Sequence, residues 1–272
     1  MGSPDPVLTA LKDFGLNVVR LPRENLGPFT VLVRDGSRMS ITGSLAELMK
    51  SAVSLPAVTA NQTAAGISGT STRELSVKVG VSLLGGWLQA LGGGKVGLEA
   101  QFKNAATVKF TFEQVLLDTT SAIGIDKFLA KSTLDPDARQ HMKLLESDRI
   151  YVIVRAAKSK KFSVEATRSD GQSVALDVPV LKDIAGGSVS VTASHSSSSA
   201  VSYEGKKPLY FGFEAIQLFY DGSVYRGYEP LAPGAAAVLS AAEDAEFEQR
   251  VRRVRFSFDA PFVPVDDLNE AD

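Results

Sequence analysis

The chain contains few side chains whose types and spacing suit catalysis, and each candidate motif is incomplete. The run GGGK at Gly92–Lys95 is spelled like the end of a phosphate-binding loop. That motif also needs a glycine five residues before its last glycine, and Ser or Thr after the lysine. Gln89 and Val96 stand at those two positions. The glycine run is therefore predicted to be a flexible connection and not a nucleotide site.

Histidines and carboxylates do not complete a site either. The chain has no cysteine and two histidines, His141 and His195, which are too few for a typical zinc site. His195 lies among serines, but no G-x-S-x-G nucleophile elbow occurs. Carboxylates such as Asp177 and Asp183 are common on any surface, and nothing in the sequence fixes two of them at catalytic separation. We therefore expect no enzyme activity, no metal and no cofactor.

Composition narrows the class of protein. Hydrophobic residues make up 44% of the 272 residues and charged residues 22%, which is typical of globular proteins. The formal net charge of -2, with both signs interleaved, does not indicate a nucleic-acid partner. No apolar run approaches the roughly 18 residues of a membrane helix, and no signal peptide opens the chain. We expect a cytoplasmic protein with helices and strands, in which any membrane activity comes from strands.

Two strictly alternating segments, residues 74–83 and 95–103, are the most informative elements. In each, apolar side chains alternate with polar or small ones, which predicts strands with one apolar face. The glycine-rich bridge between them holds Trp87, Leu88 and Leu91. We predict a β-hairpin that suits either a folded sheet or the wall of a membrane barrel, whose strands need roughly 9–11 residues. Its apolar face consists of Leu75, Val77, Val79, Val81, Leu83, Val96, Leu98, Ala100 and Phe102.

Alternation, caps and turn residues predict the remaining elements. A second hairpin is assigned loosely to residues 162–167 with 174–180, or to an extension through 188–202. Other strands are expected at residues 17–21, 29–34, 38–42, 106–112, 151–155, 189–193, 209–220 and 223–228. Helices are expected at residues 5–14, 44–53, 114–130, 136–145 and 235–254.

Three blocks of the sequence stand out together. They are DPVLTALKDFGLNVVRLPR at Asp5–Arg23, the two hairpin regions, and LYFGFEAIQLFYDG at Leu209–Gly222. With these blocks the chain resembles the bacterial gasdermins over almost its whole length, and NVVRLPR is the most specific part. The resemblance implies an α+β fold with a twisted, mostly antiparallel central sheet and surrounding helices. It also implies a pore-forming domain at residues 1–235, followed by a linker or helix and a short autoinhibitory segment in residues 236–272.

The resemblance further implies a function. The chain would be a soluble, autoinhibited cytoplasmic monomer until a caspase-like protease removes its C-terminal segment. The body would then bind membrane lipids and self-associate into a large β-barrel pore in the inner membrane. The pore would kill the cell, as a defence against phage. The alternative from the residues alone is a soluble β-rich binding or scaffold protein whose hairpins never leave the sheet.

The two ends of the chain carry part of this expectation. Family members commonly have a palmitoylated cysteine near the N-terminus. Ser3 is the candidate for that position here, and because the chain has no cysteine, the thioester cannot form. Apolar tail residues are expected to cover an oligomerisation edge, or else to form an ordinary terminal strand: Phe256, Phe258, Phe262 and Val263. Cleavage is expected in the preceding chain, after one of four candidates: Leu239, Arg250, Arg252 and Arg253.

Elementary energetics limit how such a hairpin enters a bilayer. An isolated hairpin has unpaired backbone groups at its edges, and each costs several kcal/mol in hydrocarbon. Insertion must therefore accompany side-by-side assembly into a closed ring. The apolar faces would then meet lipid, while the opposite face would line water with Lys78, Glu99, Gln101 and Lys103.

Overall fold

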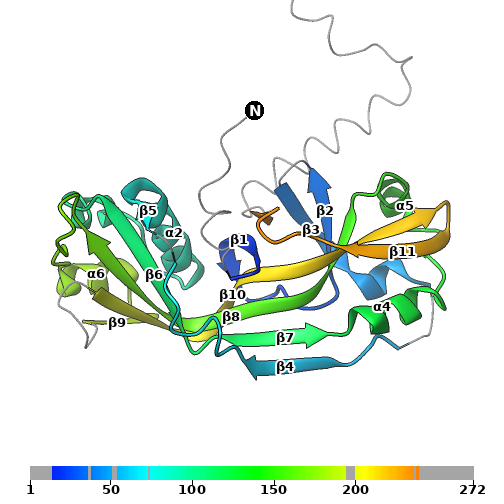
Figure 1. Cartoon of the computed structure of the whole chain (residues 1–272), viewed down its shortest axis with the longest axis horizontal. Coiled ribbons are helices and arrows are strands. Elements are labelled where there is room, and N and C mark those ends of the chain that lie inside the picture. The colour runs from blue at the N-terminus through cyan, green and yellow to red at the C-terminus, as the bar shows by residue number, and fades with distance from the viewer. Residues whose placement is uncertain are drawn as a thin grey trace, which may run out of the picture.

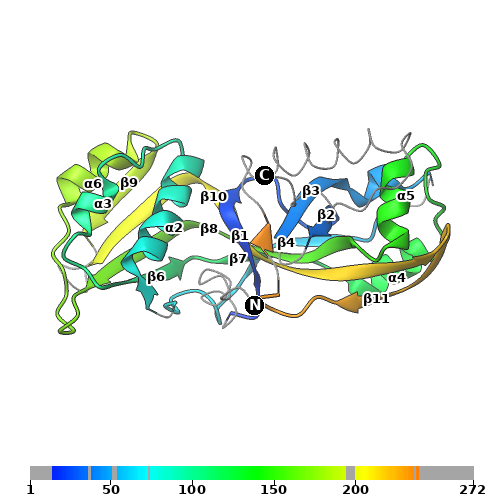
Figure 2. The same cartoon turned by 90° about the horizontal axis from the view of Figure 1, so that it is seen from above.

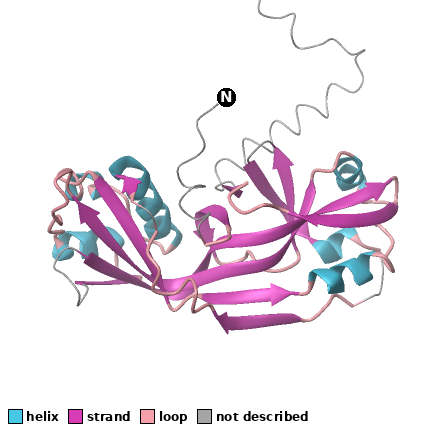
Figure 3. Cartoon of the chain, viewed as in Figure 1, coloured by secondary structure: helices cyan, strands magenta, loops and turns pink. Residues whose placement is uncertain are grey.

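The computed structural model describes residues 14–35, 38–50, 54–72, 74–193, 200–235 and 237–238. Within these residues a curved, mostly antiparallel sheet runs along the molecule, and helices pack against it near both ends (Figure 1, Figure 3). The predicted α+β fold with a twisted, mostly antiparallel sheet is confirmed.

The elements follow in chain order. They are β1 (Asn17–Arg23), β2 (Thr30–Asp35), β3 (Arg38–Ser44), the 3-10 helix η1 (Leu45–Leu48), β4 (Val58–Thr63), β5 (Leu75–Ser76), α2 (Val77–Ala90), α3 (Leu98–Gln101), β6 (Thr107–Glu113), β7 (Leu116–Thr120), α4 (Ala122–Leu129), α5 (Arg139–Glu146), β8 (Ile150–Thr167), α6 (Val178–Ala185), β9 (Val189–Ala193), β10 (Ala200–Asp221), β11 (Val224–Pro230) and β12 (Ala237–Val238).

Two long strands, β8 and β10, form the spine of the sheet. They pair antiparallel from Glu165 opposite Ala200 to Tyr151 opposite Gln217. The register shifts at three places along this pair, and such irregularities bend and twist strands. Figure 2 shows both strands passing from one end of the long axis toward the other. The spine therefore connects two regions with different layers.

The two regions are a distal lobe and a body. The distal lobe consists of β5, β6, β9, α2, α3, α6 and the adjoining parts of β8 and β10, on the left of Figure 1. The body consists of β1 to β4, β7, β11, β12, η1, α4, α5 and the rest of β8 and β10. In the lobe the sheet order is β5–β6–β8–β10, with β9 also paired to β10.

In the body the strand pairing closes into a ring. The order β10–β1–β12–β3–β2–β8 returns to β10, because β8 and β10 pair directly. Neighbouring strands contribute to one buried apolar cluster, with Val19, Leu32, Met39, Ile153 and Phe213. The short strand β12 pairs in parallel with both β1 and β3. The chain beyond β11 therefore supplies the strand that closes the body.

Several local predictions are confirmed in outline. Strands occupy the predicted positions at β1, β2, β3, β6, β9, β10 and β11, and β8 covers two predicted strands. The short helix expected around residues 44–53 is η1, with Leu45 and Leu48 buried. The helix expected at residues 5–14 lies outside the described residues.

Other local predictions are wrong. Residues 116–120, expected as the start of a helix, form strand β7. In this strand Asp118 and its neighbours pair with β8. The strand expected at 174–180 is replaced from Val178 by α6, which Asp177 caps through the Val180 N–H and Pro179 helps to start. The helix expected at 235–254 is contradicted at 237–238 by β12, and its remainder from residue 239 lies outside the described residues.

Candidate functional site

The first predicted hairpin is not a hairpin in this structure, and that correction defines the site. Residues 77–90 form helix α2, and residues 98–101 form α3. Leu75 alone of the predicted apolar face lies in a strand, β5. The others lie in α2, in α3 or in the adjoining loops: Val77, Val79, Val81, Leu83, Val96, Leu98, Ala100 and Phe102.

The sequence of α2 supports two periods at once. The odd residues from Val77 to Leu83 follow a strand period, whereas Val81, Leu84 and Leu88 also follow a helical period and are buried. As a helix the segment VKVGVSLLGGWLQA is intrinsically weak. Each of its glycines costs about 0.8–1.0 kcal/mol relative to alanine, and its valines lose rotamer freedom. Packing on the sheet, and not local propensity, therefore holds α2 in its helical form.

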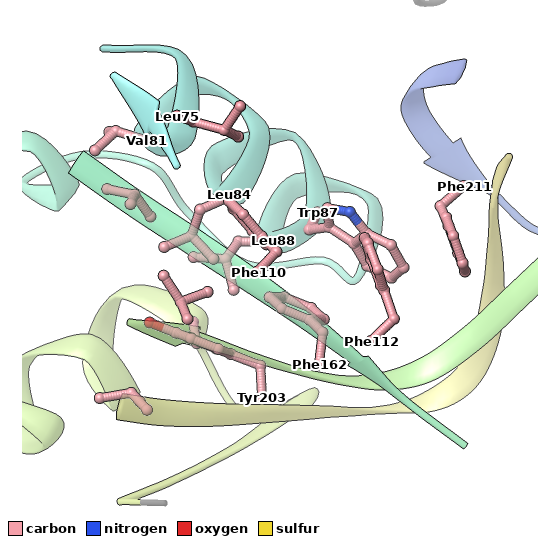
Figure 4. Close-up of a cluster of buried hydrophobic side chains, with 14 of the residues drawn as sticks. Leu75, Val81, Leu84, Trp87, Leu88, Phe110, Phe112, Phe162, Tyr203 and Phe211 are labelled. Atoms are coloured by element: carbon pink, nitrogen blue, oxygen red, sulfur yellow. The ribbon is translucent and has the colours of Figure 1, made fainter. Parts of the chain in front are cut away.

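Trp87 anchors α2 in the core of the distal lobe. It is 0% exposed, and its ring centroid lies 4.8 Å from that of Phe162 and 5.8 Å from that of Phe112 (Figure 4). Phe112 in turn stacks on Phe211 at 4.1 Å. Of the predicted bridge residues, Trp87 and Leu88 are buried and Leu91 is partly buried at the helix end. In this state the bridge is therefore part of the folded core of the lobe, and it does not form the connecting end of a hairpin.

Glycines allow α2 to lie directly on the sheet. A Cβ atom at Gly80 would lie 2.5 Å from the Cβ of Val108 in β6. A Cβ atom at Gly205 in β10 would lie 2.5 Å from a Cδ atom of Leu91. Both distances are too short for real side chains, so these two positions fix how closely the helix approaches the strands.

A second segment, between β8 and β10, packs against the first. The amide of Gly94 donates to the carbonyl oxygen of Ile184 at 2.8 Å, at the C-terminal end of α6. A Cβ atom at Gly93 would lie 2.5 Å from the carbonyl oxygen of Ala185. A Cβ atom at Gly92 would lie 4.0 Å from the Cβ of Ser188. The glycine run thus docks on the backbone at the end of α6, and the two connecting segments of the lobe are interlocked.

Two polar atoms in the lobe core have no partner among the described residues. The Nε1 atom of Trp87 and the hydroxyl of Tyr203 are both fully buried and make no hydrogen bond. Burial raises the pKa of the Tyr203 hydroxyl far above its usual value. Each unsatisfied group costs about 1–3 kcal/mol. The lobe is therefore well packed but carries a built-in energetic penalty.

A buried ion pair lies where the lobe meets the body. The Asp118 carboxylate of β7 accepts hydrogen bonds from Lys158 Nζ on β8 at 2.6 Å, from Tyr210 on β10, and from the amide of Asn61 on β4 at 2.8 Å. Burial acts to raise the pKa of Asp118, but the hydrogen bonds from Lys158, Tyr210 and Asn61 outweigh it and hold that pKa below its usual value. This network ties four strands together at the junction.

The comparisons with known proteins decide the family. A family model described as the Bacterial Gasdermin Family matches residues 19–227. A gasdermin of a Desulfuromonadales bacterium is 42% identical over 240 residues, covering 88% of this chain and 90% of that protein. The chain belongs to the bacterial gasdermin family. A gasdermin of Lysobacter enzymogenes is 40% identical over 228 residues, with 83% of this chain and 84% of that protein covered.

Structural comparison agrees on the fold. The solved structure of a bacterial gasdermin from Bradyrhizobium tropiciagri superposes with a TM-score of 0.60 at 18% identity, covering 88% of this chain and 98% of that chain. Gasdermins are a family of pore-forming effectors and not of enzymes. Among the residues described in this gasdermin, no helix has both the length and the apolar character needed to cross a bilayer.

The remaining predicted residues of this gasdermin lie outside the described residues. They are the position of the lost cysteine, the cleavage candidates and the tail contacts: Ser3, Leu239, Arg250, Arg252, Arg253, Phe256, Phe258, Phe262 and Val263. Sequence reasoning missed the interlock with α6 and the Asp118–Lys158 pair, because both join residues far apart in the chain. The glycine run was the available signal for a close backbone contact.

Proposed function

We propose that this gasdermin is an autoinhibited pore former that proteolysis activates. The observation that carries the proposal is helix α2, a helix built on a strand-patterned, glycine- and valine-rich sequence at the edge of a sheet. Such a segment has a second structure available, in which its alternating residues form one apolar face. The distal lobe is in this account the part that converts, and the body is the part that persists.

The connecting segments have suitable positions for the conversion. One segment, residues 77–106, joins β5 to β6, and the other, residues 168–199, joins β8 to β10. Since β5, β6, β8 and β10 are neighbours in that order, straightening both segments would lengthen four adjacent strands. Four lengthened strands still have two open edges, so they enter a membrane stably when copies join edge to edge in a closed ring.

The C-terminal side supplies a reason for autoinhibition. Strand β12 fills the gap between β1 and β3, and it is preceded by Leu231 and Ala235, which pack on the apolar cluster of the body. Gly234 and Ala235 also hydrogen-bond to Leu16 and Asn17. While it is tethered, β12 acts at an effective concentration of roughly millimolar, and a cut before β12 lowers its occupancy. We assign residues 1–235 to the pore-forming domain and residues 236–272 to the regulatory segment.

The finer parts of the proposal follow from family membership. The partners are membrane lipids, a caspase-like protease and further copies of the chain. The protein would rest in the cytoplasm and act at the inner membrane, where the pore kills the cell in defence against phage. The cleavage candidates Leu239, Arg250, Arg252 and Arg253 and the tail contacts Phe256, Phe258, Phe262 and Val263 stay predictions, as does the role of Ser3.

A vesicle-leakage assay tests this function. A recognition sequence for a highly specific protease is inserted after Ala235, so that cutting separates β12 from the body, and dye-loaded vesicles of several lipid compositions are mixed with intact or cut protein. We expect the intact protein to be silent and the cut protein to release dye. The unmodified chain treated with the same protease is the matched control. Silence of verified, cut protein on every lipid would contradict the proposal and favour a scaffold protein.

A further inference from the structure

The strand pairs of the distal lobe already define how the first converted hairpin would be aligned. In β5–β6, Leu75 pairs with Val108 and Ser76 with Thr107, so the residue numbers of each pair sum to 183. If the antiparallel register continues, every later pair keeps this sum. The strands then meet in a two-residue turn at Leu91–Gly92, inside the glycine-rich bridge. Glycine suits such turns.

Two further strand pairs give an independent check. In β6–β8, Thr107 pairs with Thr167, a sum of 274, which places Gly92 opposite Lys182. In β8–β10, Glu165 pairs with Ala200, a sum of 365, which places the turn of the second hairpin at Lys182–Asp183. Three separately observed registers therefore put the tips of both hairpins at the same level.

We propose that these registers create one continuous lipid-facing band across the four lengthened strands. The inference rests on the proposed function and specifies its membrane contact. The face in question continues the one that carries Leu75, Val108 and Ala166, which are buried in the lobe core. On this face the first three strands contribute Val81, Leu83, Gly85, Trp87 and Gln89, then Phe102, Ala100, Leu98, Val96 and Gly94, then Gln172, Val174, Leu176, Val178 and Val180.

On the third strand, the band has the height of a bilayer core and is bordered by charged residues. On the third strand it extends from Gln172 to Val180, which are nine residues apart counting both ends, within the roughly 9–11 that a membrane strand needs. The next residues on the same face are Asp170 on one side and Lys182 on the other. No charged residue lies between these borders on this face of the first three strands. A charge-free band of this height fits hydrocarbon, and Asp170 and Lys182, which border it on the third strand, fit the two interfaces.

The fourth strand completes the band from β9. In the resting state β9 pairs with β10, for example Val191 with Tyr203. In the extended register Val191 would instead face Val174, and Val189 would face Leu176, so apolar residues meet apolar residues. Conversion therefore requires β9 to exchange one strand partner for another. On the opposite face, the second to fourth strands carry Glu99, Gln101, Asp177 and Ser190, which suit a water-filled lumen, whereas the first strand places Leu84 and Leu88 there.

Cysteine labelling of this cysteine-free chain tests the register. Single cysteines that carry an environment-sensitive fluorophore are placed at positions exposed in the resting state, so that the label does not disturb the core. The set predicted to face lipid is Val96→Cys, Ala100→Cys, Val180→Cys and Ala193→Cys. The matched set predicted to face water, each next to a member of the first, is Lys95→Cys, Glu99→Cys and Thr192→Cys. Each cut variant is mixed with vesicles whose acyl chains do or do not carry a quencher.

The expected result is a shift of emission to shorter wavelength and acyl-chain quenching for the first set, and neither for the second. Dye leakage is recorded in the same samples. Leakage without this alternation, or with the two sets reversed, would overturn the register while leaving the proposed function intact. Absence of leakage from unlabelled, cut protein would overturn the proposed function, and the band with it.

Discussion

The distal lobe and the body both contain parts of the long strands β8 and β10, but different elements pack on these strands in the two regions. In the body, six strands pair in a ring around buried apolar side chains of β1, β2, β3, β8 and β10, and η1, α4 and α5 pack over a second apolar cluster. In the lobe, helices built from strand-patterned sequence cover the sheet, with Trp87 packed in the core and glycines at the closest contacts between helix and strands. This difference fits the proposal that one sheet carries a permanent region and a convertible one, according to what is packed against each.

The largest expected effect comes from locking the lobe. A disulfide between Gly92→Cys and Ser188→Cys would join two Cβ positions that are 4.0 Å apart in the resting state, at the cost of a side chain at Gly92, where φ is +84°. In the extended registers the same positions would be two strands and five residues apart, roughly 19 Å. We expect the oxidised, cut protein to release no dye and the reduced protein to release it fully.

A second cysteine pair controls for the disulfide itself. Ser76→Cys with Thr107→Cys joins residues that are paired in β5–β6 and stay paired in the extended register. This bond should leave leakage unchanged. Full leakage from the oxidised Gly92–Ser188 variant would show that the lobe need not open.

The next effect concerns the junction between lobe and body. Lys158→Met leaves the buried Asp118 carboxylate without its cation, which typically costs about 3–5 kcal/mol of unfolding free energy. The matched control is Lys160→Met, which removes a half-exposed pair with Glu204 and should cost about 1 kcal/mol or less. Denaturant unfolding of both variants measures the difference. Equal losses of unfolding free energy in the two variants would mean that the buried Asp118–Lys158 pair stabilises the protein no more than a half-exposed ion pair does.

The same network predicts a pH dependence. The pKa of Asp118 is lowered from 3.8 in the folded protein, so the network stabilises fully above that value and is lost as pH falls through the lowered pKa. Asp118→Asn should therefore lose stability at neutral pH and show a shallower decline of stability below about pH 3.8. Unfolding free energies measured from pH 2 to pH 7 in both proteins test this. A decline as steep in the variant as in the parent would assign the acid sensitivity to other groups.

Two alanine substitutions in α2 should act in opposite directions. Gly80→Ala places a methyl group 2.5 Å from Val108, an overpacking that costs about 1–3 kcal/mol and exceeds the gain in helix propensity. Gly85→Ala meets its nearest atom at 3.6 Å and should stabilise the helix by about 0.5–1 kcal/mol. After cutting, Gly80→Ala should speed leakage and Gly85→Ala should slow it. Changes of the same sign would argue that helix α2 does not limit conversion.

The smallest expected effect comes from removing the buried hydroxyl of Tyr203 from the core of the lobe. Tyr203→Phe deletes a hydroxyl that has no partner among the described residues, so the resting fold should be unchanged or stabilised by up to about 1 kcal/mol. Thermal unfolding of the two proteins makes the comparison. A clear loss of stability would reveal a hydrogen bond to that hydroxyl.

The long strands of the sheet could be predicted from the sequence more accurately than the helices that pack on them. Alternation in β6 and in the second half of β8 reflects one buried and one more exposed face, and the continuously apolar runs in the first half of β8 and in β10 reflect burial on both faces. Both are local properties of the sequence. Residues 77–90 satisfy both the strand and the helical period, and packing on distant residues such as Val108 and Phe162 selects the helix. The Asp118–Lys158 pair and strand β12 join segments that are distant in the chain, so no local pattern announces them.

Conversion of α2 into a strand would roughly double the length of its segment, and this length can be measured before and after cleavage. Spin labels at the exposed positions Lys78→Cys and Gln89→Cys span eleven residues, which is about 17 Å along a helix and about 36 Å along a strand. We expect the distance between the two labels to be near 17 Å in the intact protein. In cut protein on vesicles, where labelled chains are diluted with unlabelled ones, we expect it to be near 36 Å. A distance that stays near 17 Å in leaking vesicles would contradict this conversion.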